Sequence, residues 1–218
     1  MKKLLAVLFS ALLVCSCGAI LSACGEPPHE HTTDDSGFCM TCDKPINYTK
    51  GIIYDVYSDG TCAEVIGYDG SSTKINIAPT YNNLPVKSLA RGCFKDTNII
   101  KVVIPDSVTS IGEFTFFDCS SLATIEIPDS VNSIGSYAFS GCSLTSIEIP
   151  NSVTSICAFA FSGCGSLTSV TFKDKLTWYV TYSHDGCVKK TGGSKIDITS
   201  PTGNAKYFRQ LAYHWYKI

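Results

Sequence analysis

The residues best suited to chemistry lie near the N-terminus, where two histidines and two cysteines form the pattern His29-x-His31-x7-Cys39-x2-Cys42. Zinc binds imidazole nitrogen and thiolate sulfur in tetrahedral sites, and a Cys-x2-Cys turn can present both sulfurs to one ion. Four protein ligands leave no open coordination position, so such a zinc ion would be structural. The pattern leaves two alternatives open, a local Cys39–Cys42 disulfide or no site at all.

A second reactive position is Cys24. The chain begins with Met1-Lys2-Lys3 and continues with an uncharged apolar stretch, which is the layout of a secretory signal peptide. Leu21-Ser22-Ala23-Cys24 resembles the lipobox of bacterial lipoproteins, in which the cysteine is lipidated and becomes the mature N-terminus. We therefore expect a lipid anchor at Cys24 and a location in the bacterial cell envelope, exposed outside the cytoplasm. Plain secretion and an uncleaved membrane anchor are the alternatives.

Other reactive side chains do not form a catalytic pattern. His184, Asp185 and Cys187 are close in sequence, but they fall in a segment expected to be a hairpin tip. The chain has no nucleophile elbow, Walker loop, dinucleotide fingerprint or metalloprotease helix. We expect no enzyme activity and no required cofactor, with structural zinc as a possible addition.

The composition excludes two classes of protein. Of the 218 residues, 44% are hydrophobic and 17% are charged, which is not the composition of a disordered chain. The formal net charge of −2 provides no basic surface for nucleic acid. The 12 cysteines are many for a cytosolic chain of this length and favour an exported protein.

An internal repeat supplies the elements that would position a site. Residues 105–127, 128–149 and 150–172 align end to end, and a degenerate copy precedes them, so about four repeats are expected. A unit of about 23 residues cannot bury an apolar face alone, so the copies must stack. The alternating end of each copy, such as residues 144–149, predicts a strand and hence a parallel sheet. The shared apolar columns are Val108, Val131 and Val153; Ile111, Ile134 and Ile156; Phe116, Phe139 and Phe161; Leu122, Leu144 and Leu167; and Ile127, Ile149 and Phe172.

The pattern Ile-Pro-Asp-Ser-Val-Thr-Ser-Ile-Gly-x-x-x-Phe-x-x-Cys-x-x-Leu-x-x-Ile resembles the BspA-like, or Treponema-type, bacterial leucine-rich repeat over residues 79–172. The resemblance implies a mainly β, right-handed solenoid on the bacterial surface, in a family with members linked to adhesion to host matrix proteins or other cells. It carries no fixed functional residues over to this chain.

Five parts are expected along the chain. They are a lipoprotein signal peptide (1–23), a polar tether with the possible zinc clip (24–49), an N-terminal β cap (50–78), the leucine-rich repeats (79–172) and an aromatic-rich, β-rich C-terminal cap (173–218). The terminal parts should shield the open ends of the core.

Three cysteines, Cys119, Cys142 and Cys164, share one column of the repeat. Thr97 occupies this column in the degenerate copy, and threonine can replace a small side chain that hydrogen-bonds a loop but not a disulfide partner. We therefore predict that these three are buried, reduced thiols. Their survival in an exported protein suggests an anaerobic host. Cys62, Cys93, Cys157 and Cys187 have no predicted partner.

A rigid strand face is the best candidate for binding. Its outward positions form two columns, from which we select seven candidate ligand-face residues: Lys101, Thr124, Glu126, Ser146, Glu148, Ser169 and Thr171. Stacked Glu126 and Glu148 should repel each other, which fits either a solvated polar face or a cationic partner. The sequence favours a surface protein that binds a protein or glycan. A structural envelope component that assembles with other surface proteins is the alternative.

Overall fold

The computed structural model describes residues 32–43, 45–174, 177–182, 194–196, 198–210 and 213–217. The chain from Thr32 onward forms one compact unit, and the following account concerns that unit. Among the residues described, no helix is both long and apolar enough to cross a bilayer. The elements are β1 (Ile52–Val56), β2 (Ala63–Tyr68), β3 (Lys74–Asn76), β4 (Thr80–Tyr81), β5 (Leu84–Leu89), β6 (Lys101–Val103), β7 (Ser110–Ile111), β8 (Ser133–Ile134), β9 (Ser146–Ile149), β10 (Ser155–Ile156), β11 (Ser169–Phe172), β12 (Trp178–Tyr182), β13 (Ser194–Ile196), α1 (Pro201–Gln210) and β14 (Tyr213–Lys217).

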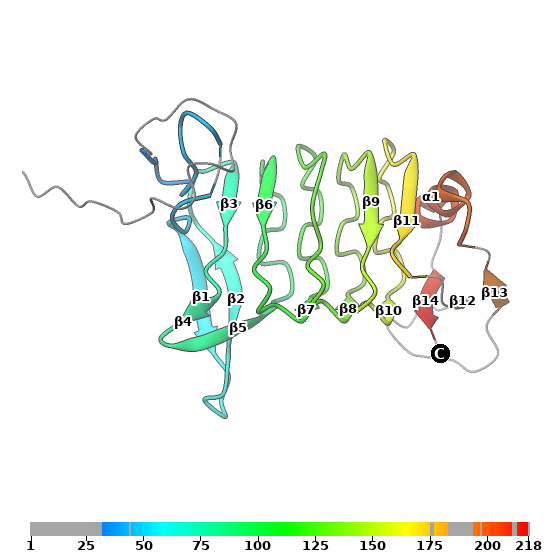
Figure 1. Cartoon of the computed structure of the whole chain (residues 1–218), viewed down its shortest axis with the longest axis horizontal. Helices are drawn as coiled ribbons and strands as arrows, with labels where there is room; N and C mark the ends of the chain where they lie inside the picture. Colours follow the sequence, from blue (N-terminus) through cyan, green and yellow to red (C-terminus); the bar gives the residue numbers. More distant parts are fainter. Residues whose placement is uncertain are drawn as a thin grey trace, which may run out of the picture. The chain divides into compact units, whose positions relative to one another are not determined.

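The repeats form the predicted leucine-rich-repeat solenoid, with about five turns (Figure 1). Each repeat passes through a strand on one side, which is Ser-Ile in β7, β8 and β10 and ends in Ser-Leu in β5, and these four strands pair in parallel there. Serine aligns with serine at every step, from Ser88 through Ser110 and Ser133 to Ser155. The repeat length of 22 or 23 residues therefore sets the register of the sheet.

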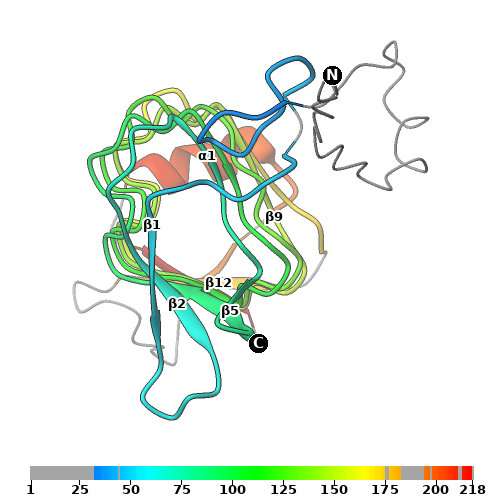
Figure 2. The same ribbon diagram turned by 90° about the vertical axis from the view of Figure 1, so that its left-hand side faces the viewer.

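The N-terminal cap forms an additional coil of the solenoid. β2 pairs in parallel with β5, and β3 pairs in parallel with β6, so residues 63–76 stack on the repeats without sharing their sequence pattern. This explains why the solenoid has about five turns where the sequence indicated about four. β1 then pairs antiparallel with β2 in a hairpin that extends beyond the ring of coils (Figure 2).

The core lies inside the coils and follows the predicted columns. Phe94, Phe116, Phe139 and Phe161 are buried and stack with ring centroids 5.2 to 5.5 Å apart. Stacking identical side chains buries both faces of each ring, which one repeat could not do alone. Every member of the five columns is buried except Phe172, which is partly buried against the core.

The C-terminal part of the chain packs on the last repeat, and it contains a helix that we did not predict. Phe208 of α1 continues the phenylalanine stack, with its ring centroid 4.9 Å from that of Phe161. β14 pairs antiparallel with β10 and so closes the parallel sheet. A local start signal was present, because Pro201 occupies the first helical position and the Ser200 hydroxyl accepts the amide of Gly203 (3.2 Å).

The predicted polar tether is folded where the structure describes it, which corrects our expectation of a linker. Phe38 and Cys39 are each only 2% exposed. The Thr49 hydroxyl donates to the carbonyl of Ser36 (2.5 Å) and accepts the amide of Asn76 (2.7 Å), which attaches this segment to β3. We call residues 32–49 the N-terminal module. The segment has no apolar periodicity, and it is held in place by one buried aromatic ring, that of Phe38, and by side-chain hydrogen bonds.

The column of buried cysteines is confirmed as reduced and structural. The thiols of Cys119, Cys142 and Cys164 donate to carbonyl oxygens of the preceding turn at 3.0 to 3.1 Å, and none is in a disulfide. The Thr97 hydroxyl also donates to the carbonyl of Phe94 (2.7 Å), which lies within its own turn and is the oxygen that accepts the Cys119 thiol. Burial raises the pKa of the Cys164 thiol to about 12 and raises that of Cys142 further. These thiols are therefore poor nucleophiles.

Cys157 differs from the column, because it is disulfide-bonded. Its partner lies outside the residues that the structure describes. The sequence left the partner and redox state of Cys157 open, because the repeat offers no companion in its own column and the bond leaves that column. One chain thus combines protected thiols with a cross-link, and the presence of thiols alone does not identify an anaerobic host.

Candidate binding face

The structure brings all seven predicted ligand-face residues onto one side of the solenoid, although one of them, Lys101, is engaged within the protein. Ser146 aligns with Ser169 and Glu148 with Thr171 in the parallel pair β9–β11. Thr124 and Glu126 lie on the preceding coil, in the segment 124–127, and are exposed. We call the surface formed by β6, residues 124–127, β9 and β11 the strand face. Alternation along each strand places the intervening Ile147 and Val170 in the core.

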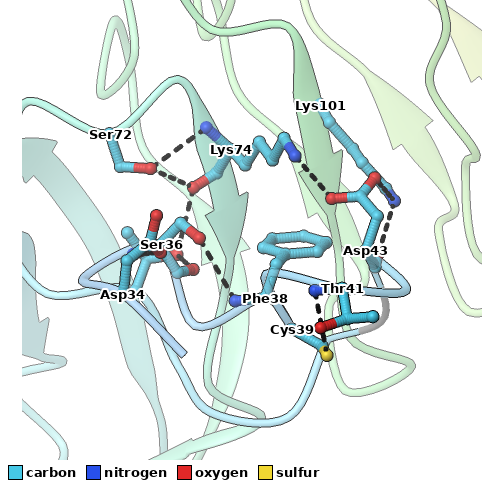
Figure 3. A network of polar contacts seen from close by, with 10 residues as sticks. Asp34, Ser36, Phe38, Cys39, Thr41, Asp43, Ser72, Lys74 and Lys101 are labelled. Atoms are coloured by element: carbon cyan, nitrogen blue, oxygen red, sulfur yellow. Dashed lines mark hydrogen bonds and ion pairs between the residues drawn. The ribbon is translucent and has the colours of Figure 1, made fainter. Parts of the chain in front are cut away.

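Lys101, the seventh predicted residue, is engaged within the protein. Its ammonium group donates to the Asp43 carboxylate (2.9 Å) and to the Asp43 carbonyl oxygen (3.1 Å), and it lies 4.8 Å from the centre of the Phe38 ring. Figure 3 shows this lysine and Lys74 converging on Asp43 from two neighbouring strands. The N-terminal module therefore occupies the β6 end of the strand face, and Lys101 holds it there.

Asp43 was not singled out from the sequence, although it organises this contact. Lys74 bonds one carboxylate oxygen (2.5 Å) and Lys101 the other (2.9 Å). These hydrogen bonds, that from Lys74 first, lower the pKa of the Asp43 carboxyl. The sequence gives no hint of the contact, because Lys101 is 58 positions away along the chain.

Of the two stacked glutamates predicted to repel each other, Glu148 has a nearby cation and Glu126 has none among the described residues. The Lys173 ammonium lies 3.0 Å from Asp129 and 3.5 Å from Glu148. The bond to Asp129 is the main cause of the raised pKa of Lys173. Glu126, by contrast, makes no ion pair with any described residue. The same is true of Asp106, which follows β6 in the chain. The strand face therefore retains two exposed, uncompensated carboxylates.

Two grooves flank the segment 124–127. The larger, of about 330 Å³, separates it from β6 and is lined by Val102, Val103, Ile104, Pro105, Asp106, Glu126 and Pro128. The smaller, of about 200 Å³, separates it from β9 and β11 and is lined by Thr124, Ile125, Glu126, Ile127, Ser146, Ile147, Glu148 and Lys173. Glu126 borders both. Sequence analysis selected Glu126 but missed the groove itself, along with Asp106 and Lys173.

The backbone between these grooves is not paired. β6 pairs with β3, and β9 pairs with β11, but residues 124–127 join neither sheet. Within the described part of the chain, no N–H or C=O group of these four residues has a hydrogen-bond partner in the protein. The side chain of Ile125 is accordingly only partly buried, whereas Ile147 at the equivalent position is 3% exposed. The main-chain donors and acceptors of this segment are thus unpaired with any described residue, although β6 and β9 lie on the coils to either side.

The proposed zinc clip lies only partly within the structure. Cys39 and Cys42 lie on one turn of the N-terminal module and are thiols rather than a disulfide, so that alternative is not formed. The Cys39 sulfur accepts the amide of Thr41 (3.4 Å). His29 and His31 lie outside the described residues, as do Cys24 and the signal segment. Among the residues described, no cluster of three or more metal-binding side chains occurs. The zinc clip and the lipid anchor stay predictions.

The weak catalytic candidates cannot be placed either. His184, Asp185 and Cys187 lie outside the described residues. The buried thiols that are described have raised pKa values because of burial, which is the opposite of what nucleophilic catalysis requires. The arrangement of the described residues suits binding by a rigid surface better than catalysis.

Comparison with known proteins agrees with this geometry. The family model for the BspA type leucine rich repeat region matches residues 87–213 in six copies. The crystal structure of the Treponema pallidum leucine-rich-repeat protein is 32% identical, covers 55% of this chain and has a TM-score of 0.53; the chain spans only 56% of that protein. A leucine-rich-repeat protein from Bacteroides capillosus is 30% identical over 57% of this chain and 95% of its own, with a TM-score of 0.51. No curated protein matches the chain.

Proposed function

Because the chain belongs to the BspA-type leucine-rich-repeat family, whose fold generally serves as a non-catalytic binding scaffold, we propose that it is a surface adhesion protein that binds a protein or glycan. The observation that carries the proposal is the strand face, on which Glu126 lies exposed between two grooves and forms no ion pair with a described residue. Stacked coils hold this surface rigid, so little conformational entropy is lost when a ligand binds.

The remaining parts of the proposal concern location. Lipidation at Cys24 would attach the protein to the membrane, and the N-terminal module would then separate the anchor from the repeats. The lipobox residues Leu21 to Cys24 and the apolar segment before them support this anchor. Nucleic acid is an unsuitable partner for a chain with a net charge of −2.

A binding panel tests the proposal. The intact protein, displayed on its own cell, is exposed to immobilised host matrix proteins, to a glycan array and to envelope fractions of the producing cell. Saturable binding to a matrix protein or glycan supports the adhesion role. Binding to the envelope fractions alone overturns it and favours the structural envelope component instead.

The anchor is tested separately. Wild-type protein should incorporate labelled fatty acid and sediment with membranes, whereas Cys24→Ala should do neither. Cys62→Ala is the matched control, because Cys62 lies in the folded unit on the loop between β1 and β2. Equal lipid incorporation by the Cys24→Ala variant would exclude the lipobox.

A further inference from the structure

We propose that β1, the outermost strand of the ten-stranded sheet, binds an extended peptide that carries lysine or arginine and apolar residues on one face. The proposal goes beyond the adhesion role, because β1 lies at the N-terminal end of the solenoid and not on the strand face (Figure 1). It combines three observations: an open strand edge, exposed apolar side chains along that strand and negative charge without ion pairs.

The position of β1 leaves room for an added strand. β1 comes first in the order of strands in its sheet and pairs only with β2. Coils in the middle of the solenoid have a neighbour on each side, whereas no described strand pairs with the outer edge of β1. The β1–β2 hairpin also extends beyond the ring of coils (Figure 2). A peptide could therefore pair with β1 without entering the solenoid.

Hydrogen bonds at the two ends of the hairpin show which main-chain groups face inward. The amide of Tyr57 donates to the carbonyl of Cys62, and the amide of Asp69 donates to the carbonyl of Gly51, each at 3.0 Å. Residues 51 and 57 therefore face β2. Because main-chain groups alternate in direction along an antiparallel strand, residues 53 and 55 face β2 as well.

The main-chain groups of Ile52, Tyr54 and Val56 consequently point away from β2. Of these groups, only the Val56 amide has a partner among the described residues, the Asp55 carboxylate (2.8 Å). The N–H groups of Ile52 and Tyr54 and the carbonyl oxygens of all three residues thus form an open edge. Extended peptides add to such an edge through main-chain hydrogen bonds.

Exposed apolar side chains accompany this edge. Ile53 on β1 and Tyr57 directly after it are each 41% exposed, and Ile66 on β2 is 42% exposed. Asp55, which is also exposed, lies between Ile53 and Tyr57 in the alternation of the strand. Side chains on neighbouring strands contact those at the same level, so a peptide face with the order apolar, basic, apolar would match Ile53, Asp55 and Tyr57.

Charge selects a basic peptide over a second copy of this chain. Residues 51–70 contain four carboxylates and no lysine or arginine. None of the four, Asp55, Asp59, Glu64 and Asp69, forms an ion pair with a described residue. Pairing of β1 with β1 of a second copy would bring two such hairpins together without a cation from either. Lysine or arginine on a peptide would supply the missing positive charge and increase the rate of association.

The first test uses the full-length protein and the peptide Lys-Thr-Val-Thr-Lys-Thr-Val-Thr-Lys with blocked ends. We expect saturable binding that weakens as salt is raised, because exposed charges are screened. The same peptide with glutamate in place of lysine should not bind. Equal binding of the two peptides would overturn the charge selection.

N-methylation of the peptide tests the backbone pairing. One version is methylated on every threonine nitrogen, and the other on every lysine and valine nitrogen, so each loses the N–H donors of one edge and keeps its charge. Only one edge of the peptide can face β1, and one version should therefore bind at least roughly fivefold more weakly than the other. Equal affinities of the two versions would overturn main-chain pairing.

A variant of the protein locates the charge contact. Asp55→Asn keeps an acceptor for the Val56 amide but removes the charge, and it should weaken binding of the lysine peptide roughly two- to fivefold. The matched control is Asp106→Asn, which removes the same charge from an exposed position after β6. If both variants lose affinity equally, the attraction is general and the assignment to β1 is wrong.

Hydrogen exchange and oligomeric state give readouts that do not depend on charge. In the free protein the amides of Ile52 and Tyr54 should exchange faster than those of Ile53 and Asp55, and they should become protected when the peptide binds. Sedimentation should show a monomer. A dimer in which Ile52 and Tyr54 are already protected would make a second copy the occupant and overturn the proposal. Failure of these tests leaves the adhesion role standing, because they report on β1 alone and the binding panel reports on the whole protein.

Discussion

Asp174 and Lys217 form a buried ion pair at the C-terminal end of the solenoid, with 2.6 Å between carboxylate oxygen and ammonium nitrogen and side chains only 10% and 7% exposed. Lys217 also donates to the carbonyl of Asn151 and lies over the Trp178 ring, while the Trp178 indole donates to Asp174 (3.3 Å). The group joins β14, β12 and the last repeat. It therefore closes the cap over the phenylalanine stack.

Removing one member of this pair should destabilise the protein strongly. Lys217→Met leaves the Asp174 carboxylate buried without its counter-charge, and we expect a loss of about 3 to 5 kcal/mol in the free energy of unfolding. Chemical denaturation measures the effect. Lys50→Met is the control, because its pair with Asp35 is largely exposed and its loss should leave the unfolding midpoint unchanged. Equal shifts for the two variants would contradict the buried role.

Thr97 places a hydroxyl in the column of buried cysteines, which predicts that serine can replace a cysteine there. Cys142→Ser keeps a donor for the Phe116 carbonyl oxygen and should change the free energy of unfolding by less than about 1 kcal/mol. Cys142→Val has a similar size but no donor, so the Phe116 carbonyl oxygen keeps only its bond from the Cys119 amide (3.2 Å), and we expect valine to cost about 1 kcal/mol more than serine. If serine proves as costly as valine, the hydrogen bond is not the reason for the column.

Alkaline pH should destabilise the fold through the same thiols. Folding raises their pKa, so between about pH 9 and pH 12 the native state holds protons that the unfolded chain has released. Stability is then complete below the unfolded pKa and falls as pH rises, by about 1.4 kcal/mol per pH unit for each such thiol. Denaturation at a series of pH values should show a shallower slope for Cys164→Ser than for wild type. An identical slope would contradict the assignment.

The contact between Asp43 and its two lysines should hold the N-terminal module on the strand face. Asp43→Asn removes the charge that Lys74 and Lys101 share, so we expect faster proteolysis within residues 32–49. Asp35→Asn serves as the control, because the Asp35 carboxylate pairs with the exposed Lys50 and with no other described residue. The repeats should resist protease in both variants. Unchanged cleavage of the module in the Asp43→Asn variant would mean that Phe38 and the Thr49 hydrogen bonds are enough to keep it in place.

Zinc binding can be decided by metal analysis of the purified protein. A clip formed by His29, His31, Cys39 and Cys42 predicts about one equivalent of zinc, lost on mutating Cys39 and Cys42 together to serine. Mutating Cys62 to serine should leave the zinc content unchanged. Less than about 0.2 equivalents in the wild type would dismiss the clip.

The sequence by itself determined the stacked architecture, because its evidence is periodic. Apolar residues that recur every 22 or 23 positions can be buried only by stacking, and Thr97 in the cysteine column excluded a disulfide ladder there. The helix α1 was also signalled locally, by Ser200 and Pro201, although we missed it. These features depend on a residue and its near neighbours or on the repeat, so pattern analysis can reach them.

Only the tertiary structure decided how the strand face is presented. Residues 125–128 and 147–150 have the identical sequence Ile-Glu-Ile-Pro, yet the second belongs to a paired strand, whereas the first forms no sheet pairing with any described residue. Likewise, Lys101 occupies a predicted ligand position but binds Asp43 of the N-terminal module. A strand is completed by a partner in register, and an ion pair by a residue distant in sequence. Neither the strand partner nor the ion-pair partner can be read from the local sequence pattern. The repeat therefore predicted the strand face, whereas contacts with other parts of the chain determined which of its residues are paired.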